Sequence, residues 1–337
     1  MTAPRRINKT YLSGLVALAL MSMVGCTEDT PAAIRPHGAA ARDINELWWV
    51  LLGLGTATYL GVMALALFAL FRRRKQDFDY QTNDQNGRRV VWIGGVLFPS
   101  LILLTTYGVT LNVLSRLAVP PITNQLVIEV TGHQWWWEVN YPRQNVITAN
   151  EIYIPTGEEI ILRLTSADVI HSFWVPELHG KMDLIPGQTN TWPLYTEQAG
   201  DYWGLCAEFC GTQHAKMLFL VIAVPPEEFR AWTESRQQPA PTPPTELAQS
   251  GFEVFVEIGC GTCHTIQGTE ADGDLGPDLT HFASRRTLGA GSLTNNRSNL
   301  AGWVVNPHGT KPGSLMPNAE IAEPDLQALL EYLETLE

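Results

Sequence analysis

Positive charge is scarce in this chain. Its 22 lysines and arginines are outnumbered by 34 aspartates and glutamates, so the formal net charge at pH 7 is −12. A surface of this sign repels the phosphate backbone of nucleic acids and suits, at most, a basic or cationic partner. We therefore expect no nucleic-acid partner.

Charge of either sign is missing from two long apolar runs, residues 47–71 and 90–114. As a helix, each run is about 37 Å long and can cross a hydrocarbon core of about 30 Å with some tilt. Neither run has the polar face that a helix at the surface of a soluble core would show. The sequence therefore predicts a transmembrane hairpin of two helices over residues 45–115.

The short loop between the two runs contains most of the basic residues of this region. They are Arg72, Arg73, Arg74, Lys75, Arg88 and Arg89. By the positive-inside rule this loop faces the cytoplasm. Both ends of the chain, and everything after about residue 115, are then expected on the periplasmic or outer face of a bacterial cytoplasmic (inner) membrane.

The N-terminus has the pattern of a signal peptide over residues 1–25, with basic residues before an apolar run too short to span a membrane. The run ends in Met23-Val24-Gly25-Cys26, which resembles a bacterial lipoprotein cleavage box. We expect lipidation of Cys26 as the first mature residue. The alternative is a free cysteine beside an ordinary cleavage site.

The residue pattern in the rest of the chain changes twice. Residues 120–230 contain short β-rich runs separated by Gly, Pro and Asn turns, typical of an antiparallel sandwich or barrel. Residues 231–246 are predicted to be a Pro-rich, semi-rigid linker. Residues 247–337 have a helical pattern at each end and a Gly-rich middle, which predicts a small all-α domain.

Cysteine is also scarce, with five in the chain, yet two lie in CAEFCGTQHAKM, residues 206–217. Thiolate, imidazole and thioether together are the donors of a copper electron-transfer site. Zinc would have little use for Met217, and a disulfide between the two cysteines would leave His214 and Met217 unexplained. Two cysteines favour a pair of coppers bridged by sulfur, with His171 as a candidate ligand from another loop.

HSFWVPELHGKMDLIPGQ followed by CAEFCGTQHAKM resembles subunit II of the haem-copper cytochrome c oxidases, which carry a dinuclear CuA centre. The resemblance covers residues 45–230 and implies a cupredoxin-like β domain. The copper ligands that it implies are His171, Cys206, Cys210, His214, Met217 and the backbone carbonyl of Glu208. It also implies that the Glu208 carboxylate binds a magnesium ion shared with subunit I.

The segment GHQWWWEVNY fits the same family, in which the first Trp after His-Gln admits electrons from cytochrome c. This resemblance makes Trp135 the expected entry point, the alternative being that Trp135, Trp136 and Trp137 belong to an interfacial aromatic belt. Two features depart from the family. Gln188 stands where an arginine is common, and the start of the second span lacks the glutamate of a proton pathway, so the resemblance does not extend to proton uptake.

A second redox motif is Cys260-Gly261-Thr262-Cys263-His264, a c-type haem attachment sequence. The two thiols add to the haem vinyl groups and His264 reaches the iron. Met316 is the candidate sixth ligand and His281 and His308 are its competitors. Resemblance to class I cytochrome c domains favours Met316, and implies that Pro277 lies near the proximal side of the haem.

With Cys26 assigned to lipid, two cysteines to copper and two to haem, no cysteine remains for a structural disulfide. The chain is thus identified, by resemblance, as a member of the caa-type cytochrome c oxidase subunit II family. Electrons are expected to pass from an external donor, such as a soluble cytochrome or the bc complex, to haem c, to CuA and to subunit I, with subunit III a further partner. The alternatives are a CuA subunit of a nitric oxide reductase and a stand-alone membrane electron-transfer protein. A quinol oxidase subunit is disfavoured because that class has lost the copper ligands.

Overall fold

The computed structural model describes residues 32–71, 84–118 and 123–337. The predicted signal peptide, Cys26 and the basic cluster at 72–75 lie outside the described residues. Ala32–Glu337 form one compact unit.

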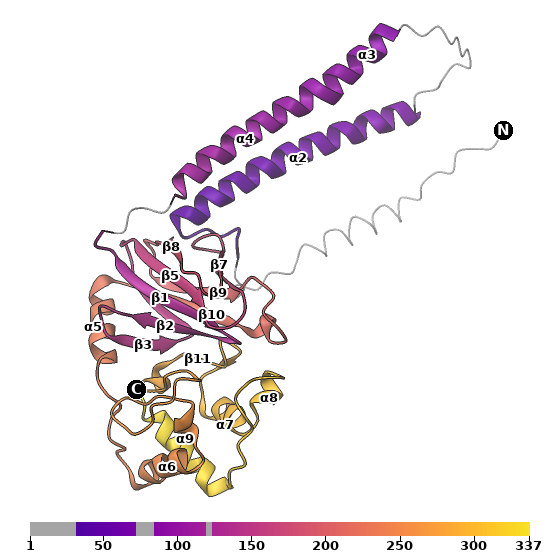
Figure 1. Ribbon diagram of the computed structural model, residues 1–337. Coiled ribbons are helices and arrows are strands. Elements are labelled where there is room, and N and C mark those ends of the chain that lie inside the picture. The colour runs from indigo at the N-terminus through magenta and orange to yellow at the C-terminus, as the bar shows by residue number, and fades with distance from the viewer. Residues whose placement is uncertain (1–31, 72–83, 119–122) are drawn as a thin grey trace, which may run out of the picture. The chain divides into compact units, whose positions relative to one another are not determined.

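Two long apolar helices lie side by side near the start of the described chain (Figure 1). The first is α2 (Ala39–Phe71). The second is continuous through α3 (Asp84–Trp92), the π-helical turn η1 (Ile93–Leu97) and α4 (Phe98–Arg116). The π turn precedes Pro99, whose missing N–H cannot close an α-helical hydrogen bond. Both helices are long and apolar enough to cross a membrane, and their apolar stretches are not buried within the chain. The runs 47–71 and 90–114 fall inside them.

The β domain is a sandwich of two five-stranded sheets. The first sheet has, in spatial order, β3 (Val146–Ala149), β2 (Trp136–Tyr141), β1 (Leu126–His133), β5 (Ile160–Ser166) and β8 (Asn190–Leu194). The second has β4 (Glu151–Pro155), β10 (Leu218–Val224), β9 (Gly200–Cys206), β6 (His171–Trp174) and β7 (Met182–Leu184). Most neighbours are antiparallel, as predicted. The pairs β1–β5 and β4–β10 are parallel because the chain crosses between the sheets there.

Alternating burial along the strands builds the core between the sheets. Ile128 and Val130 on β1 point inward, as do Trp137 and Val139 on β2. The Trp137 ring packs edge-on against Phe219 at 5.0 Å between centroids. This rigid core supports the strand ends where the functional residues lie.

The end of the β domain differs in one respect from the sequence prediction. Helix α5 (Pro226–Arg236) continues through residues 231–236, which had been expected to begin the linker. Proline in the first turn, with acidic residues at the positive end of the helix, favours this helix. Trp232 fixes it to the sandwich by stacking on Tyr153 at 4.4 Å between ring centroids.

The C-terminal domain is helical, as its terminal patterns predict. Its elements are α6 (Glu246–Glu257), η3 (Cys260–Thr262), η4 (Phe282–Ser284), β11 (Thr287–Leu288), β12 (Leu293–Thr294), α7 (Arg297–Val305), α8 (Pro307–Thr310) and α9 (Glu323–Glu334). Helices α6 and α9 cross closely at Gly251, where a Cβ atom would lie 2.0 Å from the carbonyl oxygen of Ala328. Only glycine permits this crossing, which buries Leu329, Leu330 and Tyr332.

Candidate copper and haem sites

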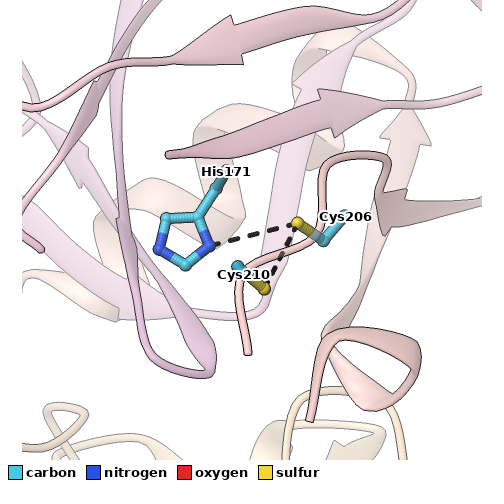
Figure 2. Close-up of side chains that lie close together, drawn as sticks. All are labelled: His171, Cys206 and Cys210. Atoms are coloured by element: carbon cyan, nitrogen blue, oxygen red, sulfur yellow. Dashed lines mark hydrogen bonds between the residues drawn. The ribbon is translucent and has the colours of Figure 1, made fainter. Parts of the chain in front are cut away.

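The copper-donor residues converge at one end of the sandwich. His171 begins β6 and Cys206 ends the antiparallel neighbour β9, so the two strands bring them together. Figure 2 shows both side chains directed at each other and at Cys210. The two sulfurs lie 3.7 Å apart, and the Cys206 sulfur lies 4.0 Å from Nδ1 of His171.

The remaining predicted donors surround the same two sulfurs. His214 begins the single turn η2 (His214–Lys216), and its Nδ1 is 3.8 Å from the Cys210 sulfur. The Met217 sulfur is also 3.8 Å from that atom, and the carbonyl oxygen of Glu208 is 3.2 Å from the Cys206 sulfur. All six residues that the resemblance implied thus lie together.

The hydrogen bond between the two thiols shifts their pKa values in opposite directions. The pKa of Cys206 falls to about 3, chiefly because its sulfur shares a hydrogen bond with that of Cys210 and also because His171 faces it. The same hydrogen bond raises the pKa of Cys210. For His171, burial lowers the pKa, but Cys206 and Asp168 outweigh it and the net shift is upward. A cation between the sulfurs would replace the shared proton.

The donor chemistry fits two soft metal ions. Two sulfurs can bridge a metal pair, with one imidazole beside each sulfur and a thioether and a carbonyl as weaker ligands. Cys206, Cys210 and Met217 are almost fully buried, which limits access of water to such a centre. The residues present therefore fit a dinuclear copper group.

Asp168 is a member of this site that the sequence analysis missed. Its Oδ1 accepts a hydrogen bond from Nε2 of His171 at 2.8 Å, which leaves Nδ1 facing the sulfurs. Burial raises the pKa of Asp168, but the hydrogen bonds from His171, Val169 and Gln134 lower it by a larger amount. The net shift is downward, so the carboxylate stays ionised. A carboxylate three residues before a candidate histidine ligand was the available signal.

The tryptophan segment lies against the ligand loop. Trp135 donates its indole N–H to the carbonyl oxygen of Cys210 at 2.9 Å, and the Gln134 side chain donates to the same oxygen at 2.7 Å. Trp137 is a core residue, and Trp136 stacks on His133 at 4.3 Å between ring centroids. All three belong to the β domain, and of the three Trp135 bonds directly to Cys210, a candidate copper ligand.

Glu208 and Gln188, named for their family roles, have other partners here. A carboxylate oxygen of Glu208 lies 3.9 Å from the ammonium of Lys181, and the other accepts from the N–H of Phe209. The Gln188 amide donates to the side chain of Asn190. A neutral amide cannot supply the charge of the arginine that it replaces.

The haem-attachment residues occupy the turn that follows α6. Nδ1 of His264 is 2.8 Å from the carbonyl oxygen of Pro277, so Nε2 is left to face a metal. Burial lowers the pKa of His264, which favours the neutral, ligating imidazole. Burial also raises the pKa of Cys260 to about 11. The donor set fits a covalent haem with an axial histidine.

The candidates for the sixth ligand differ in their surroundings. Both ring nitrogens of His281 lie within 3.0 Å of backbone carbonyls, those of Glu337 and Gln238, which disfavours it as an iron ligand. Met316 lies on the segment between α8 and α9, where its N–H bonds to the Ser314 hydroxyl. The competitor His308 lies in the short helix α8.

A two-helix anchor, a β-sandwich that gathers sulfur and imidazole donors, and a helical domain with a haem-attachment motif define a membrane-anchored electron-transfer protein. The sequence model of the cytochrome c oxidase subunit II periplasmic domain matches residues 144–224, and that of cytochrome c matches residues 248–337. The chain belongs to the cytochrome c oxidase subunit II family, as its relatives show.

Two relatives named cytochrome c oxidase subunit 2 match over nearly their full length. That of Alkalihalophilus pseudofirmus is 34% identical over 93% of this chain and 93% of its own. That of Bacillus subtilis is 29% identical over 96% of each. Among solved structures, the periplasmic domain of subunit II (CoxB) of Bradyrhizobium japonicum is 31% identical, covering 35% of this chain and 97% of that one, with a TM-score of 0.34. The predicted family and its fused cytochrome c domain are confirmed.

Proposed function

We propose that this chain is the electron-input subunit of a caa-type cytochrome c oxidase. It accepts electrons at a covalent haem c and passes them through a dinuclear CuA centre to subunit I, where oxygen is reduced to water. One observation carries the copper part of the proposal: the predicted donors meet around two sulfurs 3.7 Å apart, and the indole of Trp135 bonds to the same loop.

The residues have distinct proposed roles. The copper ligands are His171, Cys206, Cys210, His214, Met217 and the carbonyl of Glu208. The haem is held by Cys260, Cys263, His264 and Met316, and Trp135 is the electron entry point. When bound, the copper pair and the haem supply the one-electron chemistry that these side chains lack.

The chain's own contribution is to hold the donors in place. His171 and Cys206 are fixed on adjacent strands, and Asp168 orients the His171 ring through its 2.8 Å hydrogen bond. Because the scaffold already fixes the donors, little of it needs to move when the charge at the site changes.

The finer assignments belong to the same proposal. The domains run as 1–25 (signal peptide), 45–115, 120–236, a linker shortened to 237–246 by helix α5, and 247–337, with lipid on Cys26. The β and haem domains face the periplasmic or outer side of the inner membrane. Subunits I and III are partners, together with a donor such as a soluble cytochrome or the bc complex. The half-exposed carboxylate of Glu208 is a candidate magnesium ligand, for which Lys181 is a competing cation.

Oxygen uptake by the complex that co-purifies with the chain tests this function. With ascorbate and a mediator as reductant, we expect rapid uptake that is abolished in Cys206→Ser while haem c stays attached. No uptake by an intact, haem-loaded complex would contradict the oxidase assignment. Uptake of nitric oxide in its place would support the nitric oxide reductase alternative, and absence of a larger haem protein would support a stand-alone carrier.

A further inference from the structure

One buried acidic and one buried basic side chain lie at the boundary between the β domain and the haem domain. Glu151 on β4 is 2% exposed and Lys311, which follows α8, is 3% exposed. Each is hydrogen-bonded to backbone of the other domain. Buried charged groups are tolerated only where hydrogen-bond partners satisfy them. The burial of these two side chains therefore depends on the contact between the two domains.

Glu151 receives two N–H groups from the haem domain. Its Oε1 accepts from the backbone N–H of Arg286 at 2.7 Å and from that of Thr287 at 3.1 Å. The neighbouring Arg286 guanidinium pairs with Asp201 on β9. Removing the carboxylate would leave both N–H donors without this acceptor.

Lys311 makes the contact in the opposite direction, from a side chain of the haem domain to the backbone of the β domain. Its ammonium donates to the carbonyl oxygen of Trp135 at 2.8 Å and to that of Gly289 in its own domain at 3.1 Å. The adjacent Pro312 accepts a hydrogen bond from the Gln213 amide in the copper-ligand loop. Lys311 therefore ties the segment that leads to Met316 to the backbone of the proposed entry residue.

Between these two contacts, the haem domain bonds to the strand that follows the last copper ligand. The Leu218 N–H donates to the carbonyl oxygen of Ala290 at 3.0 Å. Gly291 has a φ of +74°, and a Cβ atom there would lie 2.7 Å from Cβ of Leu218. Glycine is thus required both by the backbone conformation and by the closeness of the two domains.

We propose that Glu151 and Lys311 lock the haem domain onto the copper-bearing end of the sandwich, with Lys311 as the residue that positions the Met316 segment at Trp135. The electron route itself rests on the proposed function. It follows from the lock that the chain's own haem domain covers the backbone of Trp135.

Amine acylation measures this docking without any electron transfer. The full chain, loaded with copper and haem and purified in detergent, is treated with an acetylating ester, and each lysine is quantified by peptide mass spectrometry. Each rate is divided by the rate of the same lysine in urea. We expect Lys311 to react at least about tenfold more slowly than the half-exposed Lys181, because Lys311 must first be uncovered. Equal normalised rates would overturn the proposal.

A matched pair of variants tests whether the two charges belong to one interface. Glu151→Ala is expected to speed acylation of Lys311 by about tenfold, because two buried N–H donors lose their partner. Glu129→Ala removes a carboxylate that pairs with Arg163 on the first sheet and should leave the rate unchanged. If Lys311 is acylated slowly and Glu151→Ala leaves that rate unchanged, the proposed coupling between the two residues is overturned. Haem and copper absorption serve as the check that each variant is folded.

Hydrogen exchange supplies a second readout for Lys311→Met. We expect faster exchange in the peptide containing Arg286 and Thr287, while the haem spectrum is retained. Unchanged exchange there would contradict a shared lock. A docked domain that transfers no electrons would refute the proposed route yet leave the interface, whereas an undocked domain would leave the oxidase function standing.

Discussion

The chain contains two cofactor-binding regions that are held in different ways. In the β domain, the donor atoms of residues 206–217 and His171 lie within 4.0 Å of a neighbouring donor, on strand ends and one short loop. In the haem domain, Cys260, Cys263 and His264 occupy one turn and Met316 belongs to a separate segment. A haem is large enough to become part of a domain core, whereas a copper pair fills only a small space between side chains. The geometry of the copper site should thus depend mainly on the β sandwich. The stability of the haem domain should depend on its own fold and on the bound haem together.

The largest expected effect separates the two cofactors. Cys206→Ser should abolish the copper centre while leaving haem c attached, because a hydroxyl is a poor bridging ligand for copper. Cys260→Ser together with Cys263→Ser should abolish covalent haem and leave copper in place. Metal analysis and a haem stain after denaturing electrophoresis check both. Loss of both cofactors in either variant would contradict two independently built sites.

A substitution at the helix crossing should destabilise the haem domain alone. In Gly251→Ala the added methyl meets the Ala328 carbonyl at 2.0 Å, so we expect about 3 kcal/mol less stability. The control is Gly302→Ala in α7, where nothing lies within 4 Å of the new methyl and a gain of up to about 1 kcal/mol is expected. Thermal unfolding followed through haem absorption measures both. A parallel loss of the copper signal would show that the two domains unfold together.

Acid should destabilise the β domain through His179. This residue is 5% exposed, and burial lowers its pKa from 6.5 to about 4. Between these values the unfolded chain binds the proton and the folded chain does not, so stability is complete above pH 6.5 and falls as the pH drops toward 4. The loss is at most about 3 kcal/mol. Denaturant midpoints measured at several pH values and followed through the copper absorption check it. His179→Gln should remove this part of the dependence of stability on pH. An unchanged pH dependence would contradict the assignment.

The smallest expected effect concerns the carboxylate behind His171. Asp168→Asn keeps the shape but loses the charge that orients and polarises the imidazole, so copper affinity should fall about 10- to 100-fold. Competition with a chelator measures this. Glu129→Gln, which changes a partly exposed carboxylate on β1, is the control. Equal affinity in the Asp168 variant and the wild type would show that the strands alone position His171.

Local patterns pointed to the candidate copper and haem donors because each set is concentrated in a short motif. CAEFCGTQHAKM holds most of the copper donors within one loop, and the haem thiols stand beside their histidine. The two spans and the terminal helices of the haem domain followed from apolar runs and helical periodicity in the same way. What these patterns predicted is therefore local in the chain.

Two of the residues that the sequence analysis missed, Glu151 and Lys311, act through contacts between distant segments. Glu151 meets the N–H of Arg286, and Lys311 meets the carbonyl of Trp135. Such backbone partners leave no trace in periodicity or motif spacing. The helix at 231–236 was missed because the proline-rich composition that follows it dominated the prediction.

Electron transfer from haem c to copper within one chain is the central claim. It is tested most directly by reducing haem c rapidly in the purified complex and following its reoxidation together with the copper absorption. The account predicts that both signals change with one rate constant that does not depend on the concentration of the complex. A rate constant that rises with that concentration, or haem c that stays reduced while copper is oxidised, would contradict it.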